Sequence, residues 1–214
     1  MKLTYLFISI LMCNVAFSQE PRVITFDSEQ EKNSNNNSEK NIIKISLFEI
    51  ISGDFPLYYE RVLSDKFSLE GSVGITFGDY IGGLFLDDFS SIDNSSNSNY
   101  GFSFSASLRF YPIEILEEFY IAPEFKYRKY NWEREYSDMS GISNLYAENR
   151  TYAMPRINLG YSFFYDNQLI FDYYVGIGMN NITENRYDYE TNNISESKLR
   201  RPRVHIGLKI GYVF

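Results

Sequence analysis

The sequence contains one cysteine, Cys13, and one histidine, His205. Cys13 lies in a segment that we expect to be removed, so the mature chain would have no cysteine, which excludes disulfide scaffolds and cysteine metal sites. A single histidine is too few for a zinc site, and we predict no metal and no cofactor. After the N-terminal segment there is no run of ~18 apolar residues, which excludes a helical membrane protein. The net charge of −8 argues against nucleic acid as a partner.

Residues 1–18 have the organisation of a secretory signal peptide. A basic start precedes an apolar stretch over residues 3–15, and Ala16-Phe17-Ser18 places small residues where signal peptidase inspects the chain. A lipoprotein signal ending at Cys13 is an alternative, although large residues precede that cysteine where a small one is expected. Residues 19–40 are rich in Gln, Glu, Asn and Ser, and we expect them to form a flexible periplasmic segment.

From Asn41 onward, apolar and polar residues alternate, which is typical of β-strands with two unlike faces. In the last strand one face is made of Val204, Ile206, Leu208, Ile210, Tyr212 and Phe214. The other face is made of His205, Gly207, Lys209 and Gly211. The pattern predicts eight strands, at about residues 43–47, 57–62, 66–77, 100–111, 119–130, 149–164, 168–179 and 201–214.

The predicted connections alternate between short and long. Residues 63–66, 112–118 and 165–167 form short ones, whereas residues 78–99, 131–148 and 180–200 form long polar ones. The first hairpin also closes tightly, with a turn at Ser52-Gly53-Asp54. This alternation is typical of an up-and-down outer-membrane barrel with short periplasmic turns and long extracellular loops. An even number of strands places both ends of the barrel on the periplasmic side.

The apolar strand faces could meet either lipid or a protein core. A soluble β-sandwich alternates in the same way, and a soluble lipocalin-like barrel would fit if the apolar face enclosed a ligand. Three features favour lipid. The strands have the length of tilted membrane strands, about ten residues, rather than the about five to six of soluble ones. Small residues such as Ser103, Ser105 and Ser107 on the polar faces suit a narrow barrel interior, and Tyr and Phe recur at strand ends, as in interface girdles.

The signal peptide, the alternating strands and the terminal Tyr212-Val213-Phe214 together resemble the small eight-stranded outer-membrane barrels of the OmpA transmembrane domain, OmpX and OmpW types. The resemblance covers residues 41–214. The segment Leu57-Tyr58-Tyr59-Glu60-Arg61, followed by Phe67-Ser68-Leu69-Glu70, also looks like the opening hairpin of an uncharacterised outer membrane protein β-barrel domain family. The resemblance implies an all-β, eight-stranded antiparallel up-and-down transmembrane β-barrel. It also implies that Tyr212 and Phe214 form an assembly signal read by the barrel assembly machinery.

The polar strand faces carry charges of both signs, which we predict to point into the barrel. The interior of an eight-stranded barrel is just wide enough for side chains, and buried charges must be paired. We therefore predict a plugged, salt-bridged interior, with a narrow gated path for ions or small solutes as the alternative. The predicted interior charges are Lys44, Glu60, Glu70, Arg109, Glu124, Lys126, Arg128, Arg156, Asp172 and Lys209.

The expected function is non-enzymatic: a contribution to envelope integrity, or to surface interaction through the long loops. An envelope enzyme acting on lipid A is a further alternative, but it would need a serine and a carboxylate at His205. No serine lies close to His205 in the sequence, so we predict no catalytic residues. The expected partners are outer-membrane lipids, lipopolysaccharide and the barrel assembly machinery, with the chain as a monomer.

Overall fold

The computed structural model of the chain describes residues 41–78, 96–137, 143–165, 168–188, 191 and 193–214. The predicted signal peptide, the predicted periplasmic segment 19–40 and most of the predicted connection 78–99 lie outside these residues. In the described part of the chain, no helix is both long and apolar enough to cross a lipid bilayer.

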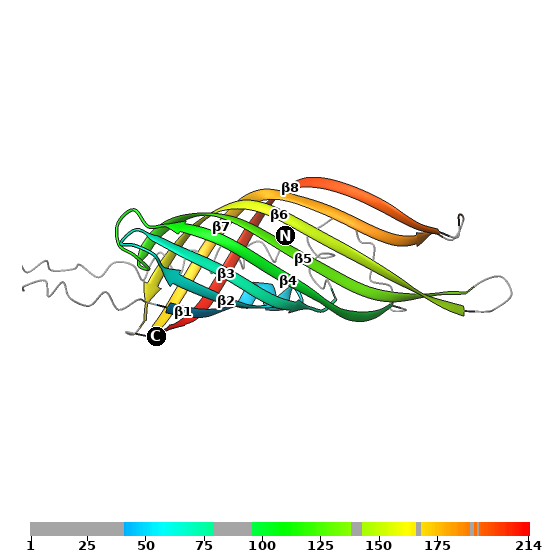
Figure 1. The fold of residues 1–214 in the computed structure, drawn as a ribbon, viewed down its shortest axis with the longest axis horizontal. Helices are drawn as coiled ribbons and strands as arrows, with labels where there is room; N and C mark the ends of the chain where they lie inside the picture. The colour runs from blue at the N-terminus through cyan, green and yellow to red at the C-terminus, as the bar shows by residue number, and fades with distance from the viewer. Residues whose placement is uncertain (1–40, 79–95, 138–142, 166–167, 189–190, 192) are drawn as a thin grey trace, which may run out of the picture. The chain divides into compact units, whose positions relative to one another are not determined.

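The described residues form a closed antiparallel barrel in which each strand pairs with its neighbours in the sequence. This architecture confirms the predicted eight-stranded up-and-down barrel (Figure 1). The strands are β1 (Asn41–Ser46), β2 (Asp54–Val62), β3 (Phe67–Thr76), β4 (Ser96–Phe110), β5 (Glu118–Ser137), β6 (Ser143–Phe164), β7 (Leu169–Asp188) and β8 (Asn193–Val213).

The first and last strands close the ring. β1 and β8 pair antiparallel from Ile42 opposite Val213 to Ser46 opposite Lys209. Asn41 and Phe214 exchange both backbone hydrogen bonds, at 3.1 and 2.9 Å between nitrogen and oxygen. Phe214, the terminal aromatic residue, therefore lies at the seam of the barrel, where β1 and β8 meet.

Four strands are much longer than predicted, so the prediction of residues 131–148 and 180–200 as loops is wrong. β5 and β6 pair as far as Ser137 opposite Ser143, and β7 and β8 pair as far as Asp188 opposite Asn193. We call these outer parts of β5–β8, residues 129–137, 143–151, 181–188 and 193–200, the extension. Its two faces mix polar and apolar residues, so the extension lacks the regular alternation that reveals a strand in a sequence. Cross-strand pairing nevertheless satisfies its backbone groups.

The first hairpin also differs from the prediction. A five-residue helix, α2 (Leu47–Ile51), follows β1, and Gly53 turns the chain in the left-handed region with φ 80°. β2 then begins at Asp54, three residues before the predicted Leu57. The predicted turn at residues 52–54 is therefore correct for Ser52 and Gly53, whereas Asp54 already belongs to the strand.

Inward-facing glycines make room for large side chains on the neighbouring strand. A Cβ atom on Gly160 of β6 would collide with the ring of Tyr120, and one on Gly207 of β8 would collide with the ring of Tyr174. Tyr120 cannot move aside freely, because its hydroxyl donates a hydrogen bond to Oδ1 of Asp172 at 2.5 Å. These glycines are therefore required by packing.

The Gly160–Tyr120 contact predicts that Gly160→Ala lowers the free energy of unfolding by about 1–3 kcal/mol, the usual cost of overpacking. Gly71→Ala is the control, because its new Cβ would meet only the carbonyl oxygen of Ser105, at 3.6 Å. We expect that control to be neutral or stabilising by up to about 1 kcal/mol, since glycine is unfavourable in strands. Urea unfolding of detergent-solubilised protein measures both. Equal effects of the two substitutions would contradict this packing.

Candidate functional site

All ten charged residues predicted for the interior lie inside the barrel. Nine of them are buried, and the side chain of Arg128 is 15% exposed. Two further carboxylates that the sequence reasoning missed, Glu49 and Asp54, are buried with them. Together these residues form two charge clusters, each with three cations and three carboxylates.

The cluster nearer Asn41 and Phe214, which we call the terminal-side cluster, contains Lys44, Glu60, Glu70, Arg109, Asp172 and Lys209. Arg109 lies at its centre. Its guanidinium contacts Asp172 at 2.7 Å, Glu60 at 3.6 Å and also Glu70. Lys44 contacts the same three carboxylates. Since each carboxylate is shared between cations, loss of one side chain would leave several charges without a partner.

The other cluster, which we call the extension-side cluster, contains Glu49, Asp54, Glu124, Lys126, Arg128 and Arg156. Glu49 accepts contacts from Lys126 at 2.6 Å and Arg128 at 2.9 Å. Asp54 lies 3.1 Å and 2.7 Å from the same two side chains. Arg156 donates two hydrogen bonds to Glu124, both 2.9 Å long.

Signals for the two missed carboxylates are present in the sequence. Asp54, Pro56, Tyr58 and Glu60 alternate along β2, so continuing the inward face backward from Glu60 reaches Asp54. Glu49 is a lone carboxylate within the apolar segment Leu47–Ile51, and α2 directs it into the barrel. Short helices of this kind leave no clear periodicity in a sequence.

Tyr58 links the two clusters. Its hydroxyl donates a hydrogen bond to Glu49 at 2.6 Å and accepts one from Lys126 at 3.0 Å. The ammonium group of Lys209 lies 3.9 Å from the centre of its ring, in a cation–π contact. The charged interior therefore forms one continuous network along the barrel.

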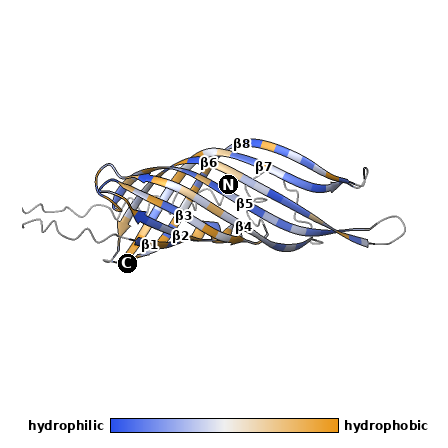
Figure 2. Cartoon of the chain, in the orientation of Figure 1, coloured by the Kyte–Doolittle hydropathy of each residue, from blue (hydrophilic) through white to orange (hydrophobic). Residues whose placement is uncertain are grey.

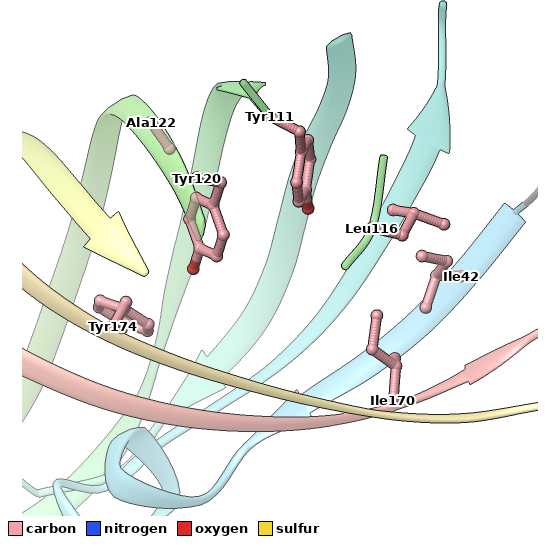
Figure 3. Packing of buried hydrophobic residues seen from close by; sticks show 7 residues of the cluster. All are labelled: Ile42, Tyr111, Leu116, Tyr120, Ala122, Ile170 and Tyr174. Atoms are coloured by element: carbon pink, nitrogen blue, oxygen red, sulfur yellow. The ribbon is translucent and has the colours of Figure 1, made fainter. Parts of the chain in front are cut away.

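An apolar layer lies at the end of the barrel that carries Asn41 and Phe214. Figure 3 shows Leu116, Ile42 and Ile170 pointing toward one another, beside Tyr111 and Tyr120. Leu116 belongs to the β4–β5 connection and has a left-handed backbone with φ 65°, which is uncommon for a non-glycine residue. Its side chain is fully buried. The connection thus folds back over the barrel end.

A small cavity lies beside the extension-side cluster. Its volume is about 60 Å³, and its lining includes Arg128, Tyr130, Tyr152, Asn180, Arg203 and His205. His205 therefore faces the interior, as predicted. Its Nε2 atom is buried and has no hydrogen-bond partner among the described residues. Ser52 also lines this cavity, but its hydroxyl donates to the backbone oxygen of Glu49 at 2.7 Å. The arrangement thus lacks the serine–histidine hydrogen bond expected of a nucleophile and its base.

Beyond the cavity, the extension has its own buried carboxylate, Glu148. It accepts hydrogen bonds from Trp132 at 2.8 Å and from Tyr136 at 2.9 Å, and lies 3.7 Å from Arg134. Desolvation, together with the bond to Glu148, raises the pKa of Tyr136 despite the opposing bond from Arg134. Tyr187 stacks on Tyr146 with ring centres 3.6 Å apart. These contacts give the extension an ordered interior of its own.

No group of three or more metal-ligating side chains is present within the described ranges. The twelve charged residues above are instead engaged with one another. Their ion pairs neutralise the buried charges, and their side chains fill the interior of the barrel.

The terminal-side cluster predicts that Arg109→Met lowers the free energy of unfolding by about 3–5 kcal/mol, because it leaves buried carboxylates without a cation. Lys198→Met is the control: Lys198 pairs with Glu196 at 2.5 Å, but its side chain is 72% exposed. An exposed pair contributes less than ~1 kcal/mol. Urea unfolding in the same detergent measures both variants. A similar, small loss in the two would show that the buried network does not stabilise the barrel.

The barrel was compared with known proteins. No family model and no curated protein sequence matches the chain. Among solved structures, a major outer membrane protein of Thermus thermophilus aligns with 83% of this chain and 100% of its own, at 16% identity and a TM-score of 0.44. The N-terminal β-barrel domain of Pseudomonas aeruginosa OprF aligns with 82% of this chain and 98% of its own, at 10% identity and a TM-score of 0.34. The outer membrane protease OmpT of Escherichia coli aligns with 82% of this chain and 93% of its own, at 11% identity and a TM-score of 0.34. The fold assignment rests on the strand pairing described above.

Proposed function

We propose that this chain is a non-conducting outer-membrane β-barrel whose extension interacts with molecules at the cell surface. The observation that carries the proposal is the contrast between a continuous apolar band outside the barrel and a neutralised charge network inside it. In a water-soluble barrel, this arrangement would be unfavourable, because it would bury the charges and expose the apolar side chains to water. In a lipid bilayer, the same arrangement is favourable.

The apolar band covers the outer face of consecutive strands. Many of its side chains are exposed, including Phe102 at 49%, Leu159 at 48%, Val175 at 49% and Ile206 at 65%. Figure 2 shows hydrophobic residues concentrated toward the barrel end that carries the C-terminus, and a mainly hydrophilic extension. Exposed apolar area on this scale marks a contact with lipid or protein, and a band that encircles a closed ring favours lipid.

The band ends at a similar level on neighbouring strands. The outer face becomes polar at Lys129 on β5, Thr151 on β6, Asn181 on β7 and Arg200 on β8. Strand pairing places Lys129 opposite Thr151, and Asn181 opposite Arg200. Between this level and the barrel end that carries Asn41 and Phe214, β5 to β8 keep 11 to 13 residues each. At ~3.4 Å per residue and a ~40° tilt they span roughly 30 Å. That height is enough for the apolar band of outer-membrane barrels, about 25 Å.

The proposed orientation places the seam residues Asn41 and Phe214 at the periplasmic end and the extension outside the cell. Lys129 then lies at the outer membrane boundary, where the phosphates of lipopolysaccharide are suitable partners. The barrel assembly machinery would read Tyr212 and Phe214, and the chain would act as a monomer. A contribution to envelope integrity is compatible with the same architecture.

The charge network favours a plugged barrel over a channel. An ion crossing the interior would have to pass both clusters, in which each of the twelve charged side chains already contacts an opposite charge. The apolar layer around Leu116 would add a second barrier at the periplasmic end. An enzymatic activity on lipid A is disfavoured, because the hydroxyl of Ser52, which shares the cavity with His205, donates its hydrogen bond to the backbone oxygen of Glu49.

The plug predicts an absence of single-channel current steps when purified protein is inserted into planar lipid bilayers. Both clusters and the apolar layer would have to open for ions to pass. A porin added to the same membrane provides the control for insertion and detection. Reproducible current steps from this protein alone would support the channel instead.

The lipid contact predicts that Leu159→Arg impairs insertion, because an arginine on the lipid face near the midplane costs about 2–4 kcal/mol. Leu145→Arg is the matched control on the same strand. Leu145 lies in the extension and is 59% exposed, against 48% for Leu159. We expect the control to fold normally. Heat-modifiable gel mobility of membrane-extracted protein reports folding of each variant. Equal tolerance of both would mean that the apolar band does not meet lipid.

A further inference from the structure

The cavity beside the extension-side cluster carries a cation that has no counter-charge among the described residues. Arg203 lies on β8 two residues from His205, and both side chains line the cavity. The two charge clusters balance, because each contains three cations and three carboxylates. Arg203 belongs to neither, and it makes no ion pair or side-chain hydrogen bond with any residue that the structure describes. The cavity wall therefore has an excess of positive charge.

Two other polar groups of the wall also lack partners within the described ranges. They are Nε2 of His205 and Oδ1 of Asn180, both buried. The side chain of Asn180 is almost fully enclosed, since the residue is only 2% exposed. Buried polar groups in proteins are nearly always hydrogen-bonded. Two buried polar groups without partners, beside an arginine without a counter-charge among the described residues, therefore point to a ligand inside the cavity.

We propose that this cavity binds a small oxyanion, that is, a phosphate-like or carboxylate ion, with Arg203 as its principal ligand. The guanidinium of Arg203 presents N–H donors in a planar fork that matches two oxygens of such an ion. His205 can donate from its ring. Rotation of the Asn180 amide about its last torsion exchanges its oxygen for an NH₂ group, which supplies a further donor.

The size and surroundings of the cavity agree with this ligand class. A water molecule needs ~15 Å³ of such space, so the volume of about 60 Å³ has room for an ion with three or four oxygen atoms. Arg128 adds positive potential from the same wall, although its own guanidinium is engaged by Glu49 and Asp54. Since the lining comes from inward faces of a closed ring, a membrane lipid cannot reach it from the side. A free ion entering from the extension side is therefore the occupant.

The test measures the thermal midpoint of full-length mature protein in neutral detergent during titration with sodium phosphate or sodium acetate. Sodium chloride at equal ionic strength provides the baseline. A ligand that binds only the folded state raises Tm along a saturating curve. We expect such a curve for at least one oxyanion. Arg203→Gln, which removes the charge and leaves a polar side chain, should weaken the apparent affinity about tenfold or more.

Arg200→Gln is the matched control. It removes the same charge from the same strand, three residues away, on the outer face of β8. We expect it to retain the wild-type response to oxyanions. Heat-modifiable gel mobility confirms that each variant is folded, and Arg203→Gln should fold because the arginine supports no ion pair among the described residues. No saturable response in the wild type, or an equal response in Arg203→Gln, would overturn the proposal.

Discussion

Charge pairing inside a narrow ring constrains the rest of this structure. Eight strands enclose a space that side chains alone can fill, and any charge placed there must find its partner within that space. Twelve charged side chains satisfy this requirement by forming two balanced clusters joined through Tyr58. Strand register, inward glycines and the inward helix α2 are all arranged around these contacts. Replacing such a network by apolar residues can stabilise a protein. We therefore infer that the ion pairs serve to fix the strand register and do not maximise the free energy of unfolding.

The outside of the barrel follows from the same alternation. Most inward charges are followed by an apolar residue that faces outward, as Asp54 is by Phe55 and Arg156 by Ile157. The apolar band and the charge network are therefore the two faces of one alternating pattern. The extension departs from this rule because both of its faces are polar or mixed. Its own buried carboxylate, Glu148, and its tyrosine contacts hold it together beyond the apolar band. The proposed position in the membrane, with the apolar band in lipid and the extension in water, accounts for this division.

The fold class and the interior charges could be predicted from the sequence because both depend on a period of two. Alternation along β8 identified the outer face that ends at Tyr212 and Phe214, and the inner face that contains His205 and Lys209. Alternation fails where both faces mix polar and apolar residues, so residues 131–148 and 180–200 were taken for loops. It also fails at α2, whose five residues bring Glu49 into the extension-side cluster. The cavity at Arg203 is lined by residues of four strands, β5 to β8. Residues that come together from separate strands leave no local pattern in the sequence.

The central claim is that the outer band of the barrel contacts lipid while the extension does not. Quenching of tryptophan fluorescence by lipids brominated along their acyl chains tests it directly. The measurement uses protein in which Trp132, the single tryptophan, is replaced by phenylalanine and one tryptophan is introduced, by Leu159→Trp or by Leu145→Trp. The account predicts strong quenching for Leu159→Trp and little for Leu145→Trp. Equally weak quenching at both positions in folded, membrane-associated protein would contradict it.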